Sequence, residues 1–207
     1  DIYEQSYSRN IIKEEFSNVF LKKGEVEYKE FEDFFLTDEE YIFSLTIEKD
    51  SIHQWSYYGG KDGYAISFRK KDLCNALINQ FNSYTYNLVI YDQVKQRKYI
   101  NYLLSLSKDI QNASPRLMTL SSFFDSNLYL RSISSLFKQN NHSCEKEYRI
   151  SILDDTKEKK FRIKNGLFIP YKIMTFPKDR IPIKSIMVGP KVENEIATDG
   201  LYQFIRS

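Results

Sequence analysis

The 207-residue chain is 42% hydrophobic and has 30 Lys and Arg residues against 28 Asp and Glu residues, a net charge of +2. This length and apolar content are enough for one buried core, so we expect a single domain over residues 1–207. The balanced charge gives no reason to expect a membrane or nucleic-acid partner. The lack of a signal-peptide pattern and of an apolar run of about 18 residues favours a cytoplasmic location.

Apolar periodicity divides the chain into helices and strands. A spacing of three to four residues predicts helices over residues 8–22, 70–82 and 192–204. It also predicts a helical insert over about 92–139, with a break at Ser114-Pro115. Alternating residues, or short apolar runs between turn residues, predict strands at 41–47, 64–68, 86–91, 148–153, 161–163, 167–173 and 183–188.

This order of elements predicts an α+β fold rather than a doubly wound parallel sheet. Strand, helix and strand alternate only once before the insert, and the strands after residue 147 follow one another with turns between them. We therefore expect a mixed or mainly antiparallel sheet with flanking helices. The helical insert separates two motif segments, residues 54–68 and 144–152.

The second motif segment places charged residues on a strand. Side chains alternate along a strand, so Glu145, Glu147, Arg149 and Ser151 share one face, and the apolar residues between them share the core face. Two carboxylates so close together are costly in a desolvated site, so at least one should meet Arg149, a ligand cation or water. The more frequent explanation of such a pattern is a solvated strand edge with a Glu/Arg ion pair.

The first motif segment contains the only tryptophan of the chain, Trp55. Glycines at its centre predict a turn, a strand follows, and Asp50 can cap the helical turn before it. We expect Trp55 to be mostly buried. The alternative to a binding role is that Trp55 and the adjacent tyrosines simply fill the core, as large aromatic residues usually do.

Neither cysteine lies in a metal-binding motif. Cys74 and Cys144 are far apart, there is no Cys-x-x-Cys, and His53 and His142 do not stand at ligand spacing from them. We expect reduced thiols and no metal. Cys74 faces the apolar side of its helix and should be a small core residue, whereas Cys144 is the more exposed candidate.

Four motifs occur in a fixed order. They are Trp-x-x-Tyr-Gly from Trp55, Gly-x-x-Ile-x-Phe from Gly63, Glu-x-Glu-Tyr-Arg from Glu145 and Ile-x-x-Ile-x-x-Gly-Pro from Ile183. This order resembles a bacterial family, domain-of-unknown-function family 2971. Members of that family typically begin with a strand that bears a Tyr-His-Tyr-like motif. Residues 1–4 resemble the end of the next family element, so we expect that first strand upstream of residue 1.

The layout of this family is similar to that of ADP-ribosyltransferases, which implies NAD as substrate. On that resemblance Glu147 would contact the ribose and Glu145 would position an acceptor. Tyr58 would contact the nicotinamide ring with Trp55 as the wall of the site, and Tyr58 and Glu147 would face one cleft. Arg149 would grip a phosphate or, as we prefer, anchor Glu147. The early His or Arg of that layout has no counterpart that we can assign.

Three classes of function follow. The first is an NAD-using transferase or glycohydrolase that serves as a toxin or in phage defence and has a macromolecular target or regulatory partner. The second is a non-catalytic interaction or sensing module. The third is a nucleic-acid binder, suggested by two basic runs, although a solvated face explains such short runs more often. The runs are Lys95, Arg97 and Lys98, and Lys157, Lys159 and Lys160.

Overall fold

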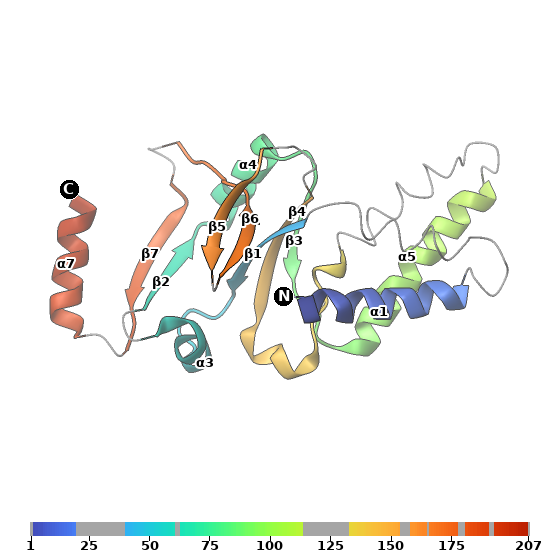
Figure 1. Ribbon diagram of the computed structural model, residues 1–207, viewed down its shortest axis with the longest axis horizontal. Coiled ribbons are helices and arrows are strands. Elements are labelled where there is room, and N and C mark those ends of the chain that lie inside the picture. The colour runs from blue at the N-terminus through green and yellow to red at the C-terminus, as the bar shows by residue number, and fades with distance from the viewer. Residues whose placement is uncertain are drawn as a thin grey trace. The chain divides into compact units, whose positions relative to one another are not determined.

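The computed structural model describes residues 2–19, 40–60, 63–113, 133–153, 158–164, 166–177, 181–190 and 193–206 (Figure 1). These residues form a mixed α+β structure with small antiparallel sheets and flanking helices, which confirms the predicted fold class. Their contacts divide the chain into two compact units. Unit 1 comprises Asp1–Leu45 and Ser83–Lys172, and unit 2 comprises Thr46–Asn82 and Ile173–Ser207.

The helices and strands of unit 1 come from two stretches of the sequence, one before and one after residues 46–82. Its helices are α1 (Ile2–Val19), α5 (Gln93–Ala113) and the 3-10 helix η3 (Asn140–Glu145). Its strands are β1 (Glu40–Thr46, whose last residue belongs to unit 2), β3 (Tyr84–Leu88), β4 (Glu147–Leu153), β5 (Lys160–Lys164) and β6 (Leu167–Tyr171). The first predicted helix therefore begins at Ile2 instead of residue 8.

The core of unit 1 lies between α1 and α5. Apolar side chains at helical spacing on both helices are buried together with two residues that follow α5 in the chain. This cluster is Ile11, Ile12, Phe16, Ile100, Leu104, Ile133 and Phe137. At the margin of the cluster Arg97 binds Glu14 and Glu15 at 2.6 and 2.5 Å. Since Arg97 is on α5 and both carboxylates are on α1, these contacts fix the register of the two helices.

Strand β4 is the central strand of the three-stranded sheet in unit 1. The strand order is β1-β4-β3, and β3 runs antiparallel to β4, with Tyr86 opposite Ile150. Both faces of β4 are buried, because Glu147, Arg149 and Ser151 are as inaccessible as Ile150. The expected charged face is therefore not solvated, and the alternative of a solvated strand edge is wrong.

The first part of the predicted helical insert is a long helix, and its last part, residues 133–139, is mostly irregular. Helix α5 confirms the helix predicted in its first half. Of the part of the predicted insert that follows the break at Ser114-Pro115, residues 114–132 lie outside the described residues. At its described end, Ile133 is helical and Phe137 forms a parallel bridge with Ile90.

Unit 2 contains a two-stranded antiparallel sheet and short helices. Strand β2 (Tyr64–Phe68) pairs with β7 (Ile183–Val188). Its helices are α3 (Ile52–Gln54), the π-helix η2 (Trp55–Gly59), α4 (Lys70–Gln80) and α7 (Asn194–Arg206). The predicted elements of this unit are thus confirmed, with ends shifted by one or two residues.

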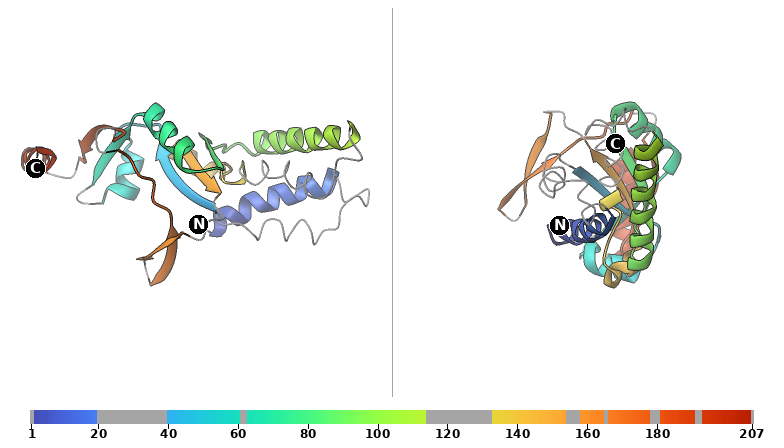
Figure 2. Two further views of the ribbon diagram at one scale, coloured as in Figure 1. Left: turned by 90° about the horizontal axis from the view of Figure 1, so that it is seen from above. Right: turned by 90° about the vertical axis from the view of Figure 1, so that its right-hand side faces the viewer.

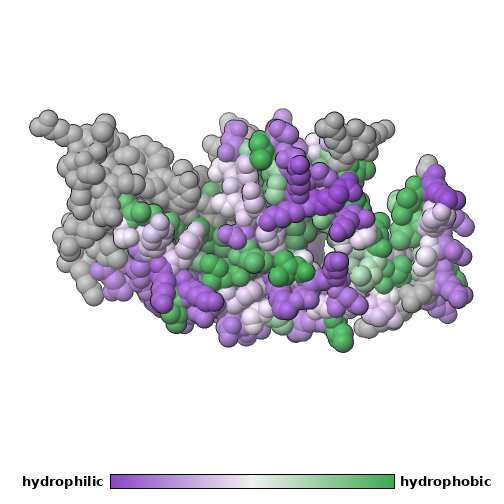
Figure 3. All heavy atoms as spheres, turned by 180° about the vertical axis from the view of Figure 1, so that it is seen from behind, coloured by the Kyte–Doolittle hydropathy of each residue, from purple (hydrophilic) through white to green (hydrophobic). Residues whose placement is uncertain are grey.

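Helix α7 is amphipathic, and Figure 3 shows hydrophobic and hydrophilic atoms on different sides of it, at the right of the picture. Among the helices of the described residues, none combines the length and the apolar character needed to cross a bilayer.

Candidate functional site

The predicted site residues fall into two groups, one in each unit. Glu145, Glu147 and Arg149 belong to unit 1, whereas Trp55 and Tyr58 belong to unit 2. The common cleft for Tyr58 and Glu147 stays a prediction, and each group is described by itself.

In unit 1, a sharp turn separates the two glutamates. Glu145 ends η3 instead of belonging to β4, as the sequence had suggested, and Lys146 between them is left-handed with φ +42°. Both carboxylates nevertheless converge on one cation. The Nζ of Lys138 lies 2.8 Å from Oε2 of Glu145 and 3.2 Å from Oε2 of Glu147. A single ammonium group thereby relieves the repulsion that two adjacent carboxylates would have in a desolvated place.

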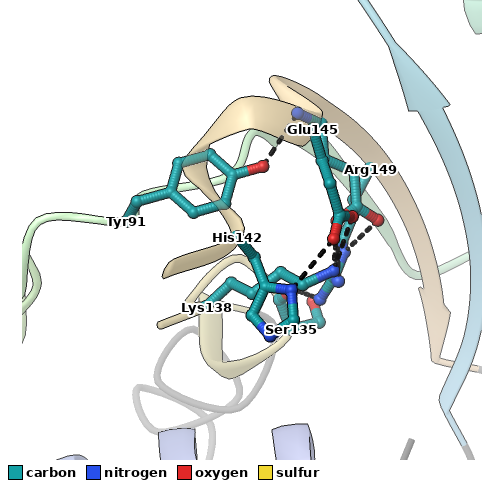
Figure 4. A network of polar contacts seen from close by, with 7 residues as sticks. Tyr91, Ser135, Lys138, His142, Glu145 and Arg149 are labelled. Atoms are coloured by element: carbon teal, nitrogen blue, oxygen red, sulfur yellow. Dashed lines mark hydrogen bonds and ion pairs between the residues drawn. The ribbon is translucent and has the colours of Figure 1, made fainter. Parts of the chain in front are cut away.

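Arg149 holds Glu147 in a two-pronged ion pair. Its Nε lies 2.7 Å from Oε1 and its Nη2 lies 2.9 Å from Oε2 of the carboxylate. The remaining Nη1 donates to the carbonyl oxygen of Ser135 at 2.6 Å. The backbone N–H of Glu147 donates to the hydroxyl oxygen of Tyr91 at 2.9 Å. Side chain and backbone of Glu147 are therefore both fixed. Figure 4 shows the network to which Tyr91, Lys138 and Arg149 belong.

These contacts keep Glu147 ionised. Burial by itself raises the pKa of a carboxyl group. Hydrogen bonds from Arg149 and Ser44, together with the positive charges of Arg149 and Lys138, outweigh this effect and place the pKa of Glu147 below its ordinary value. The pKa of the nearby Tyr91 hydroxyl shifts in the opposite direction, because burial raises it. It therefore stays neutral beside the charged carboxylate.

The network reaches from the interior to the surface through His142. Its Nδ1 lies 3.0 Å from Oε1 of Glu145. The side chain of His142 is 46% exposed, that of Glu145 14% and that of Glu147 only 6%. Since a carboxylate only accepts hydrogen bonds, the Nδ1 that faces Glu145 is the donor of this contact, and Nε2 is the other ring nitrogen. This pairing of an exposed imidazole with a carboxylate is suited to proton transfer.

Sequence reasoning missed three members of this network: Lys138, His142 and Tyr91. One signal was present for Lys138. Two glutamates beside a single arginine leave one carboxylate without a cation, and a buried carboxylate needs one. His142 stands three residues before Glu145, one turn away in η3, but this short 3-10 helix was not predicted. No comparable signal identified Tyr91, which lies in a different part of the chain.

In unit 2, the motif segment forms a turn around Trp55. The indole Nε1 of Trp55 donates to Oδ1 of Asp50 at 2.7 Å. Ser51, not Asp50 as predicted, caps helix α3 through its hydroxyl oxygen. Trp55 is of intermediate burial, so most of its surface is covered, as predicted. From Trp55 the motif segment continues as the π-helix η2, a rare conformation that is frequent at functional sites.

Three glycines pack closely around Trp55. A Cβ on Gly59 would lie 2.9 Å from the indole, and one on Gly189 would lie 2.6 Å from the carbonyl oxygen of Gly63 and 3.2 Å from the indole. The N–H of Gly189 donates to the carbonyl oxygen of Gly63 at 2.9 Å. The first, second and fourth motifs of the sequence therefore meet at one place.

Tyr58 projects from this turn and is largely exposed, as is Tyr57, whose ring lies 4.7 Å from that of His53. The cysteines are both free thiols. Cys144 is exposed, as predicted, and Cys74 is partly buried. Within the described residues, no group of three or more His, Cys, Asp and Glu side chains is arranged to bind a metal ion.

The similarity of this chain to known proteins lies in the part of the sequence that contains the motif segments. No curated protein and no solved structure matches the chain. Residues 54–150 match the family model described as "Protein of unknown function (DUF2971)". This stretch begins just before Trp55 and ends just after Arg149, so it holds three of the four motifs and supports the resemblance to domain-of-unknown-function family 2971.

Proposed function

We propose that the protein cleaves NAD at the bond between ribose and nicotinamide, as an ADP-ribosyltransferase or an NAD glycohydrolase. The observation that supports this proposal is the pair Glu145 and His142 at the exposed end of a rigid ionic network. In the reaction, the electrons of the glycosidic bond pass to the ring nitrogen of nicotinamide, and positive charge develops on the ribose. An oxygen of water or of a target residue then bonds to the ribose carbon and loses its proton.

The geometry favours a division of roles that differs from the one implied by the resemblance. Glu147 accepts two hydrogen bonds from Arg149, one from Lys138 and one from Ser44. These occupy the roughly four acceptor positions of a carboxylate, so Glu147 would have to exchange a partner before it could contact ribose. In the proposed mechanism Glu147 and Arg149 are positioning residues.

Glu145 and His142 then become the residues that meet the ligand. A negative charge on Glu145 beside the ribose stabilises the positive charge of the transition state. His142, with its Nδ1 held by Glu145, takes the proton of the acceptor oxygen at Nε2. Tyr58 keeps its proposed role as the ring that contacts cationic nicotinamide, since an exposed aromatic face attracts a cation. Trp55 supports the turn that carries Tyr58.

One observation favours a second candidate, a non-catalytic binding module. Lys138 and Arg149 balance the charges of Glu145 and Glu147, so the network is complete as a structural element without any ligand. Structural ion pairs also shift pKa values and bury charges, so these properties do not by themselves distinguish a catalytic site.

Release of nicotinamide from NAD distinguishes the two candidates. Glu145→Gln should keep the fold and lose release by about 100-fold or more, because it removes the charge that stabilises the transition state. Glu147→Gln should instead lower the free energy of unfolding by about 3 kcal/mol, because Arg149 and Lys138 lose the charge that compensates them. Glu195→Gln, at an exposed position of α7, is the matched control and should change neither.

The release assay should be run with water as the acceptor and again with a cell extract. A folded Glu145→Gln protein that releases nicotinamide at the wild-type rate would refute the assigned role of Glu145. If wild-type protein binds NAD but releases no nicotinamide under either condition, the binding module is the correct function.

A further inference from the structure

The hairpin of β5 and β6 has two faces of different chemistry. In the described part of the chain, β5 pairs with β6 and with no other strand (Figure 2). Paired residues of an antiparallel ladder share a face. One face therefore carries only apolar side chains, and the other carries every cation of β5. The apolar face consists of Phe161, Ile163, Phe168 and Pro170. The cationic face carries Lys160, Arg162 and Lys164 of β5 and, opposite them, Tyr171, Ile169 and Leu167 of β6.

The apolar face is open to solvent. Ile163 is 71% exposed and its cross-strand partner Phe168 is 75% exposed. Phe161, on the same face, is 55% exposed. A lone two-stranded hairpin is only marginally stable in water, and contiguous exposed apolar residues generally mark a surface that another molecule covers.

The charge of the hairpin indicates what covers it. Residues 158–172 contain five cations and one carboxylate, a net charge of +4, whereas the whole chain has a net charge of +2. A second copy of the chain is disfavoured as the occupant, because antiparallel pairing of two β5 edges would bring Lys160 near Lys164 of the other copy. An anionic partner is favoured instead.

We propose that the β5–β6 hairpin binds the surface of an anionic lipid bilayer. Segments that lie in a membrane interface have an apolar face and an opposite face that carries Lys and Arg, as this hairpin does. The apolar side chains would enter the boundary of the acyl chains. The long cationic side chains reach back to the headgroups while their methylene groups stay in apolar contact.

The segregation of the two faces also separates this proposal from nucleic-acid binding. Single-stranded nucleic acid binds where aromatic rings and cations share one groove, so that bases stack while phosphates meet the cations. Here the exposed rings of Phe161 and Phe168 lie on the face opposite to the cations, and the one aromatic residue that shares the face of the cations, Tyr171, is partly buried. The overall charge gave no sign of a membrane partner, because acidic residues elsewhere in the chain offset the cations of the hairpin. Strands of five residues are also too short to give a long apolar run.

Co-sedimentation with lipid vesicles tests the proposal. Vesicles of phosphatidylcholine with phosphatidylglycerol should bind the full chain, and vesicles of phosphatidylcholine alone should bind it far less. The double variant Ile163→Ser/Phe168→Ser should bind the anionic vesicles at least about tenfold more weakly. Ile196→Ser/Phe204→Ser on α7 is a matched control, since these residues are 71% and 76% exposed. It should bind as the wild type does.

A second pair of variants tests the charges. Arg162→Gln/Lys164→Gln should weaken binding to anionic vesicles by about fivefold for each cation removed. The control Lys95→Gln/Lys98→Gln removes two exposed cations of α5 and should leave binding unchanged. Far-UV circular dichroism checks that every variant is folded, which is expected because all substituted side chains are on the surface.

Three results would overturn the proposal. The first is equal binding of the wild type and both hairpin variants to anionic vesicles. The second is no vesicle binding together with tight binding of a labelled single-stranded oligonucleotide that the Ile163→Ser/Phe168→Ser variant loses. The third is a wild-type dimer that this variant converts to a monomer, which would make the hairpin an interface between copies.

Discussion

Two arginines of this chain each donate through Nε, Nη1 and Nη2 to a carboxylate and to backbone carbonyl oxygens, but in different surroundings. Arg149 binds both oxygens of Glu147 and the carbonyl oxygen of Ser135, and its side chain is 4% exposed. Arg69 binds Asp72 and the carbonyl oxygens of Ile181 and Ile183, but its side chain is 47% exposed. Comparison of the two therefore isolates the effect of burial on a guanidinium fork.

Replacement of each arginine by lysine should give very different losses of stability. A lysine cannot form the two parallel bonds, so Arg149→Lys should lower the free energy of unfolding by about 2 kcal/mol or more, because a buried carboxylate and a buried carbonyl lose donors. For Arg69→Lys we expect about 1 kcal/mol or less, since water replaces the lost donors. Urea unfolding followed by circular dichroism gives both values, and equal losses would contradict the structural role assigned to burial.

The sequence predicted only some of the residues in the ionic network around Glu147. It placed Arg149 beside Glu147 because residues two apart on a strand share a face. Lys138 and His142 reach the glutamates through the fold of residues 133–145, which combines a helical turn, a bridge to Ile90 and a 3-10 helix. Local periodicity does not encode such an irregular path, so Lys138 could not be assigned from spacing. His142 stands one helical turn before Glu145, but that spacing indicates a contact only once η3 is known to be helical.

Among the structural elements, the turn around Trp55 tolerates the fewest substitutions, because its close packing requires glycine at several positions. Gly63 has an ordinary backbone conformation, so its role is steric. A Cβ there would lie 2.2 Å from the carbonyl oxygen of Gly59, a distance at which the backbone must move. Gly200, in helix α7, is the opposite case, because a Cβ there would meet nothing within 4 Å.

Alanine at these two glycines should therefore have effects of opposite sign. Gly63→Ala should lower stability by about 2 kcal/mol or more, because the turn must open to admit a methyl group. Gly200→Ala should raise the stability of α7 by up to about 1 kcal/mol, because alanine is the better helix former. Fluorescence of the single tryptophan during urea unfolding reports the first effect directly. A Gly63→Ala protein with an unchanged midpoint would show that the turn is not closely packed.

The positions of the helices and strands were easier to predict than the pairing of the strands into sheets. Helical and strand periods located each described helix and strand to within a few residues, except that α1 begins six residues earlier and η3 was not predicted. The strands form three small sheets among the described residues, whereas one sheet was expected. The burial of both faces of β4 was also missed. Alternating charged and apolar residues normally indicate one solvated face, and only the nonlocal neighbours β1 and β3 make β4 central.

On the scale of the whole molecule, the two units have unequal cores. Of the 13 buried hydrophobic residues in the described chain, Leu73 and Leu77 belong to unit 2 and the other 11 belong to unit 1. Each buried aliphatic or aromatic side chain contributes about 1.5–3 kcal/mol relative to an exposed one. Unit 1 should therefore be the more stable of the two.

The position of Trp55 makes this difference measurable. Its fluorescence reports unit 2, while amide hydrogen exchange in α1 and α5 reports the core of unit 1. We expect the fluorescence transition at a lower urea concentration than the loss of exchange protection in these two helices. Gly63→Ala should move the fluorescence transition to still lower urea and leave the exchange of α1 and α5 unchanged. Coincident transitions in the wild type, which move together in the variant, would instead show that the two units unfold as one cooperative domain.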